Sequence, residues 1–131
     1  YRYDNGNKRG DEDPEVLKII EEERAKKGII PRKFSEEEII RRYMAAMINE
    51  AANVIFEKIA LRPSDVDVTK LFGYGFPRHR GGPLKYADSC GLDKILLDLK
   101  EFEKEDPLFW EPSKLIIELV NKGDNFGSLN N

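Results

Sequence analysis

The sequence has 131 residues, of which 40% are hydrophobic and 36% are charged, so the chain can bury the core of one small domain. Its 22 basic and 25 acidic residues are interspersed and give a formal net charge of -3, which argues against nucleic acid and anionic membrane as partners. No apolar run approaches the roughly twenty residues that span a bilayer, and the single cysteine, Cys90, forms no intramolecular disulfide. We therefore expect a cytoplasmic protein with no membrane span.

The first expected element is a helix between Asp13 and Gly28. Asp13 suits an N-cap, Pro14 suits the first helical position, and the run Lys26-Lys27-Gly28 is a stop signal. Its few apolar residues crowd the first half, which indicates a helix on a surface. We expect residues 1–13 to be a linker from a preceding domain and residues 14–131 to form the helical domain.

A second, longer helix has the strongest local signal. Ser35 to Glu38 reads SEEE, a capping box, and apolar residues then recur at helical spacing to about Ala60. The apolar stripe is wider than one helix face. We therefore expect a central helix with neighbours on more than one side.

Shorter helices follow the long one. Ser64 and Asp67 form a second capping box before a helix that stops at Gly73, and a further short helix runs from Pro83 to Ala87. After Gly91 we expect a helix with an apolar stripe that is buried. One more helix follows Pro112-Ser113 and ends at Gly123, and a polar tail comes after it. The stripe consists of Leu92, Ile95, Leu96, Leu99 and Phe102. No alternating strand pattern appears, so the predicted fold is all-α, a single small domain of five to six helices around one long helix.

The segment GYGFPRHRGGPLKYADSCG, residues 73–91, raises the question of a ligand site. Glycine-rich loops can cradle phosphates, but the dinucleotide fingerprint needs a third glycine where Arg78 stands, and no strand precedes the segment. Gly73 suits a helix end, Gly75 a turn, and the pair Gly81-Gly82 a chain reversal. The spacing of the glycines therefore favours a structural role for this segment over a phosphate-binding site. The alternative is a stand-alone helical binding module that takes an anionic ligand or protein partner on Arg78, His79 and Arg80.

Catalytic groups are sparse. His79 has no acid or nucleophile beside it in sequence, and Ser89 and Cys90 lack an identifiable third group. With one histidine and one cysteine, a zinc site would need an unusual carboxylate-rich ligand set, so we expect no metal site. Asn49 and Glu50 lie among apolar residues of the long helix, and two interpretations stay open: they hydrogen-bond the glycine-rich loop, or they face solvent.

One long segment carries a family resemblance: MINEAANVIFEKIALRPSDVDVTKLFGYGFPRHRGGPLKYADSCGLDKI. It resembles the C-terminal helical domain of 3-hydroxyacyl-CoA dehydrogenases. The likeness is closest to the second of two tandem helical repeats in multifunctional β-oxidation enzymes, such as the fatty oxidation complex alpha subunit and the peroxisomal bifunctional enzyme. It is strong over residues 39–97 and weak over residues 109–123. The opening Tyr1-Arg2-Tyr3-Asp4 also looks like the end of a preceding repeat, which implies a chain cut from a longer one.

The resemblance implies an enzyme that oxidises 3-hydroxyacyl-CoA with NAD and also hydrates enoyl-CoA. In this family an earlier domain carries the glycine fingerprint, the catalytic histidine and its partner glutamate, and none of these is present here. The first helical repeat supplies a catalytic asparagine ahead of an arginine, eight residues before its Asn-Glu-Ala. Counting back from Asn49 reaches Arg41, followed by Arg42, so the asparagine is missing.

We therefore expect an accessory domain with no catalytic, cofactor-binding or metal-binding residue of its own. It is expected to pack on other domains of the same polypeptide, to help shape the cleft for the acyl-CoA substrate, and to form a homodimer when isolated. NAD is implied only for the full-length enzyme. The residues expected to serve structure and interdomain packing are Asn49, Glu50, Gly73, Gly75, Phe76, Pro77, Arg80, Gly81, Gly82, Pro83 and Asp88.

Overall fold

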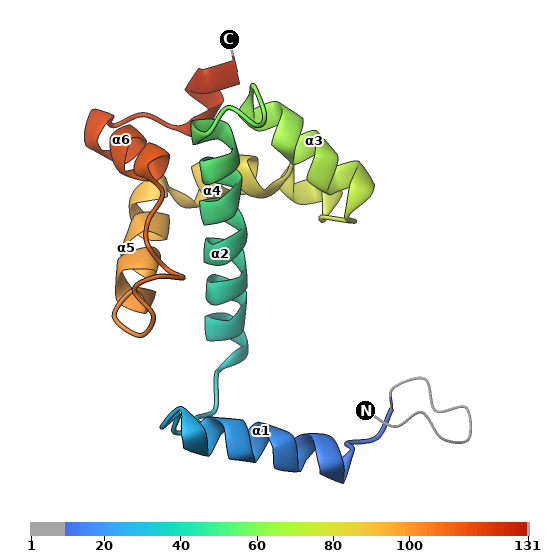
Figure 1. Cartoon of the computed structure of the whole chain (residues 1–131). Helices are drawn as coiled ribbons and strands as arrows, with labels where there is room; N and C mark the ends of the chain where they lie inside the picture. Colours follow the sequence, from blue (N-terminus) through green and yellow to red (C-terminus); the bar gives the residue numbers. More distant parts are fainter. Residues whose placement is uncertain (1–9, 131) are drawn as a thin grey trace. The chain divides into compact units, whose positions relative to one another are not determined.

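The computed structural model describes residues 10–130, where the regular secondary structure consists of six α-helices and two 3-10 segments, with no strand (Figure 1). The predicted all-α fold is confirmed. The resemblance at Tyr1 to Asp4, and the expected linker up to residue 9, lie outside the described residues. The chain divides into two compact units, Tyr1–Phe34 and Ser35–Asn131. The domain boundary expected at residue 14 stays a prediction.

Helix α1 (Pro14–Lys26) is the helix of the first unit. The Asp13 carboxylate accepts a hydrogen bond from the Glu15 N–H at 3.0 Å, and Gly28 follows the helix with a φ of 64°. These are the predicted start and stop signals, and both are confirmed. No side chain of α1 is buried.

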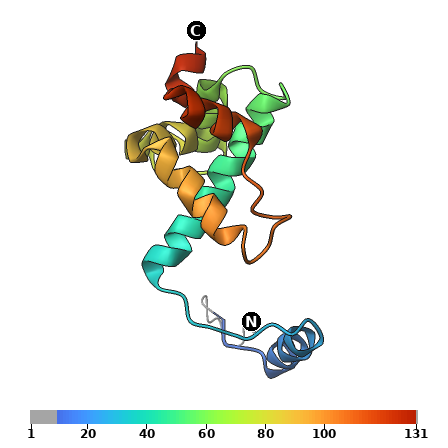
Figure 2. The same cartoon turned by 90° about the vertical axis from the view of Figure 1, so that its left-hand side faces the viewer.

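Helix α2 (Glu36–Phe56) is the centre of the second unit. The Ser35 hydroxyl accepts from the Glu38 N–H at 3.1 Å, as the predicted cap requires. The helix contacts α3, α4, α5 and α6, so the expectation of neighbours on several sides is confirmed. In Figure 1, α5 and α6 lie on one side of α2 and α3 on the other, and Figure 2 shows α5 packed along α2.

Helix α3 (Pro63–Gly73) begins differently from the prediction. Its N-cap is Arg62, whose N–H donates to the Asp65 carboxylate at 3.2 Å. The predicted capping box of Ser64 and Asp67 is wrong, because Pro63 already occupies the first turn and the Asp67 carboxylate bonds another helix.

The remaining helices are α4 (Pro83–Cys90), α5 (Leu92–Phe102) and α6 (Lys114–Lys122). The predicted stripe of α5 is buried in full, and Gly123 ends α6 with a φ of 68°. Helix α4 runs past the predicted end at Ala87, because Gly91 is the next residue that breaks the helix. No helix among residues 10–130 is long and apolar enough to cross a membrane.

The C-terminal segment is not the polar tail that its composition predicts. Residues Phe126–Asn130 form a 3-10 helix that contacts α3 and α4, and Phe126 is only 1% exposed. The Asp88 carboxylate accepts from the N–H groups of Phe126 and Gly127, both at 2.9 Å. The segment therefore closes the core of the second unit, which draws on α2 to α6 and on this last turn.

Candidate functional site

The glycine-rich segment connects α3 to α4 through two tight turns. Gly75 adopts a φ of 69°, Arg78–Arg80 form a 3-10 turn, and Gly81 and Gly82 have φ values of 76° and 106°. The chain thus reverses at Gly81-Gly82 before Pro83, as the sequence predicts. The 3-10 turn at Arg78–Arg80 was not among the elements predicted from the sequence.

The N-terminus of α4 is bonded by a carboxylate from α3. Asp67 accepts from the N–H of Leu84 at 2.8 Å and from that of Lys85 at 3.0 Å, and its side chain is buried. Burial raises the pKa of this carboxyl above its ordinary value, and the two backbone hydrogen bonds oppose the rise. A phosphate bound by the glycine-rich loop would need these same N–H groups. Both N–H groups already donate to the Asp67 carboxylate.

Gly82 is fixed by this contact. A Cβ added there would lie 2.4 Å from the Cβ, Cγ and Oδ1 atoms of Asp67, and the φ of 106° is itself unfavourable for other residues. Gly81 is nearly as restricted, since its Cβ would lie 2.9 Å from Lys85 Cγ. Gly82 therefore allows α3 and α4 to approach closely, whereas the contact at Gly81 is with the exposed Lys85 side chain of α4.

The basic residues of the loop lie on the surface against aromatic rings. The Arg78 guanidinium lies 5.2 Å from the Phe72 ring centroid, and that of Arg80 lies 4.9 Å from the Tyr86 ring centroid. His79 is exposed, and within residues 10–130 it has no hydrogen bond or ion pair with Ser89 or Cys90. Such stacking orients the guanidinium groups without neutralising them.

Two other expected residues of the loop differ in burial. Phe76 is buried in the core, and its N–H donates to the Lys70 carbonyl oxygen at 3.1 Å, while Pro77 is exposed. Gly73 is the last residue of α3, with open space where a Cβ would be. The loop is therefore held by Phe76 and by the Asp67 contact rather than by each of its glycines.

Asn49 makes a long-range connection that the sequence did not identify. Its Nδ2 donates to the Glu111 carbonyl oxygen at 2.9 Å, and its Oδ1 accepts from the Ser113 N–H at 2.8 Å. The suggested bond to the glycine-rich loop is wrong, because Asn49 faces the α5–α6 connection instead. Glu50, one residue further, is exposed.

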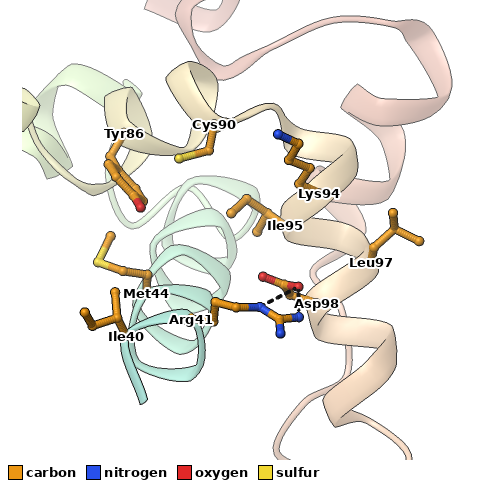
Figure 3. A pocket seen from close by; sticks show the side chains of 9 residues that line it. All are labelled: Ile40, Arg41, Met44, Tyr86, Cys90, Lys94, Ile95, Leu97 and Asp98. Carbon is orange, nitrogen blue, oxygen red and sulfur yellow. Dashed lines mark hydrogen bonds and ion pairs between the residues drawn. The ribbon is translucent and has the colours of Figure 1, made fainter. Parts of the chain in front are cut away.

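Arg41 stands where the resemblance implies a catalytic asparagine in the first repeat. Its guanidinium pairs with Asp98 of α5 (Figure 3). It also lies 3.0 Å from the Glu101 carboxylate on the same helix. Hydrogen bonds to Asp98 and then to Glu101 raise the pKa of the Arg41 guanidinium. This position therefore joins two helices.

Beside this ion pair is an open cavity of about 370 Å³ between α2, α4 and α5 (Figure 3). Its walls are largely apolar and include Met44 and Ile95, with Tyr86 and Cys90 at one end. A hydrogen bond with Cys90, and then burial, raise the pKa of the Tyr86 phenol. The cavity brings together no set of groups with a recognised catalytic geometry.

The described residues do not fit an NAD site. Dinucleotide binding needs a strand that leads through a glycine turn into a helix N-terminus, and residues 10–130 contain no strand. The N–H groups at the start of α4, after the glycines, already bond Asp67.

Comparison with known proteins gives a consistent set of relatives. A peroxisomal bifunctional enzyme of Danio rerio is 43% identical over 126 residues, which cover 94% of this chain and 18% of that protein. The Homo sapiens peroxisomal bifunctional enzyme is 38% identical over 114 residues, 86% of this chain and 16% of that protein. A glyoxysomal fatty acid beta-oxidation multifunctional protein of Brassica napus is 37% identical over 127 residues, 94% of this chain and 17% of that protein.

No family model matches the sequence. The chain spans less than a fifth of the length of the relatives that it matches. The aligned regions nevertheless cover 86–94% of its own residues. The chain therefore belongs to the family of the peroxisomal bifunctional enzymes and the β-oxidation multifunctional proteins, of which it corresponds to one segment.

Proposed function

We propose that this chain is an accessory, non-catalytic helical domain of a multifunctional β-oxidation enzyme. The intact polypeptide would oxidise 3-hydroxyacyl-CoA with NAD in another domain and would also hydrate enoyl-CoA. This segment would pack on the other domains and help shape the acyl-CoA cleft. A homodimer of the isolated chain remains a proposal of the same kind.

The observation that supports the proposal is that several residues at the positions of the family resemblance make structural contacts within this domain. Asp67, Gly82 and Asp88 hold helices and turns together, and Arg41 joins α2 to α5. The residues that carry the family resemblance thus make contacts that hold this fold together. Large apolar side chains of α2 and α3 remain exposed. This pattern is typical of a domain that supports its neighbours.

The relatives' names also bear on the compartment. Several are peroxisomal or glyoxysomal proteins. We propose the same kind of organelle for the intact polypeptide, in place of the cytoplasm that the composition alone suggested.

The test is a turnover assay with acetoacetyl-CoA and NADH. We expect the 131-residue chain to give no NADH oxidation above background, and the intact polypeptide to be active under the same conditions. A rate that grows in proportion to the concentration of the isolated chain would contradict the non-catalytic assignment. An inactive but folded intact polypeptide would contradict the assignment to a dehydrogenase.

The alternative function was a stand-alone module that binds an anion on Arg78, His79 and Arg80. These residues are exposed, and Arg78 and Arg80 are cationic, but the α4 N–H groups that would complete an anion site donate to Asp67. We therefore favour the accessory domain.

A further inference from the structure

An apolar groove runs between α2 and α3, and we call it the α2–α3 groove. It consists of two adjoining cavities of about 360 and 390 Å³, which share Tyr43, Met47 and Lys70 in their walls. Ile40 and Tyr74 line the first cavity, toward the glycine-rich loop. The groove is thus continuous along one face of the second unit.

The walls of this groove are unusually exposed for their residue types. Ile40 is 57% exposed, Tyr43 62% and Tyr74 75%. Apolar surface that is left in water costs free energy in proportion to its area, and a contiguous patch of this kind marks an interaction site. An occupant with an apolar face would remove these side chains from water.

The groove also has a distinct charge pattern. Lys70 and Arg80 line the cavity beside the glycine-rich loop, and within residues 10–130 neither forms an ion pair. Lys70 lies 4.5 Å from the Tyr74 ring centroid, and Arg80 stacks on Tyr86. Both cations are therefore held at the rim by aromatic contacts, with no carboxylate to neutralise them.

The other cavity shares Lys70 with the first, but it lacks Arg80 and adds an acidic residue. Glu50 is its one acidic wall residue, and it is exposed. An occupant that complements the groove would place a carboxylate near Lys70 and Arg80 and would keep acidic residues away from Glu50. The charges of the groove therefore indicate which end of the occupant carries the carboxylate, as well as which residue types the occupant has.

The length of the relatives indicates where the occupant comes from. The chain covers only 16–18% of their length, so in proteins of that size most of the polypeptide is available to fill the groove. A groove between two helices is suited to a third helix that inserts its apolar face.

We propose that the α2–α3 groove receives an amphipathic helix from another domain of the same polypeptide. The apolar face of that helix packs on Ile40, Tyr43 and Met47, and a carboxylate on it faces Lys70 and Arg80. This inference rests on the proposed function, since it deepens the packing role by naming the surface and the chemistry of its partner.

The experiment places a photoactivatable cross-linker in the intact polypeptide. Tyr43 is replaced by p-benzoylphenylalanine, the protein is irradiated, and the cross-linked peptides are identified by mass spectrometry. We expect Tyr43 to react with one segment outside residues 1–131 that has helical apolar spacing and an Asp or Glu within one turn. The same replacement at Leu61, which is 84% exposed and lines neither cavity, should not give that product.

Charge reversal tests the electrostatic part with the same readout. Lys70→Glu with Arg80→Glu should lower the yield of the Tyr43 cross-link at least tenfold, because like charges would then meet. Lys104→Glu with Lys122→Glu makes the same change in net charge at exposed sites outside the groove and should leave the yield unchanged. Replacing the partner's carboxylate by Lys should restore the yield in the reversed variant.

Three results would overturn the proposal. They are a Tyr43 cross-link only to a second copy of this chain, no cross-link from Tyr43 in folded protein, or a yield that is insensitive to the charge reversal. Dehydrogenase activity of the same preparation separates the two hypotheses. An active enzyme without the cross-link contradicts the groove alone, and a cross-link in an inactive protein contradicts the proposed function alone.

Discussion

Gly82→Ala should lower the free energy of unfolding by about 3 kcal/mol or more, or prevent folding of the helical unit altogether. The added Cβ would lie 2.4 Å from three atoms of Asp67, which is far inside van der Waals contact. To relieve the overlap, Asp67 would have to leave the N–H groups of Leu84 and Lys85, of which the first is buried, and both would lose their acceptor. The φ of 106° is also a strained backbone conformation for alanine but not for glycine.

The matched control is Gly73→Ala, in the same glycine-rich segment. Gly73 is helical, and a Cβ there meets nothing within 4 Å. We expect a change within about 1 kcal/mol, in the stabilising direction if alanine's helix preference prevails. Urea unfolding followed by circular dichroism measures both variants. Equal losses of stability would mean that the Asp67 contact does not determine the need for glycine.

Asn49→Ala is the second change with a large expected effect. It removes two hydrogen bonds, and it leaves the Glu111 carbonyl oxygen and the Ser113 N–H without their partner at the start of α6. Loss of a buried side chain that makes two hydrogen bonds is expected to lower the free energy of unfolding by about 2–4 kcal/mol. The midpoint of urea unfolding should fall while the denaturant dependence stays the same.

Ser113→Ala serves as the control, because it changes the same contact region without touching the backbone N–H. The Ser113 hydroxyl is buried and has no hydrogen-bond partner in the described part of the chain. Its removal should therefore be neutral or should stabilise the protein by up to about 1 kcal/mol. A larger loss for Ser113→Ala than for Asn49→Ala would show that the hydroxyl, not the asparagine, holds this connection.

Local signals in the sequence predicted most of the helices. Ser35 caps α2, the stripe from Leu92 to Phe102 is buried, and Gly123 ends α6, all as predicted. These features depend on residues within one or two helical turns of each other. The sequence displays such relationships directly.

The long-range contacts could not be predicted in the same way. Asp67 has the spacing of a local cap, yet it bonds N–H groups 17 and 18 residues away. Asn49 bonds backbone 62 and 64 residues away, and Asp88 bonds the final turn 38 and 39 residues away. Each acceptor satisfies donors that only tertiary packing brings near, so spacing along the chain does not reveal them.

The same distinction applies to the C-terminal turn. Its composition is mostly polar, and only Phe126 and Leu129 signal burial. The family resemblance pointed to Asp88 as structurally important but gave no partner for it. The structure supplies that partner in the N–H groups of Phe126 and Gly127.

The most direct test of the central claim is a calorimetric titration of coenzyme A into the folded chain, with Arg80→Ala beside it. If the glycine-rich loop serves architecture, because Asp67 already occupies the α4 N–H groups, neither protein should show a saturable heat of binding. Tight binding to the unmodified chain that Arg80→Ala abolishes would contradict the account, and it would make the loop a ligand site.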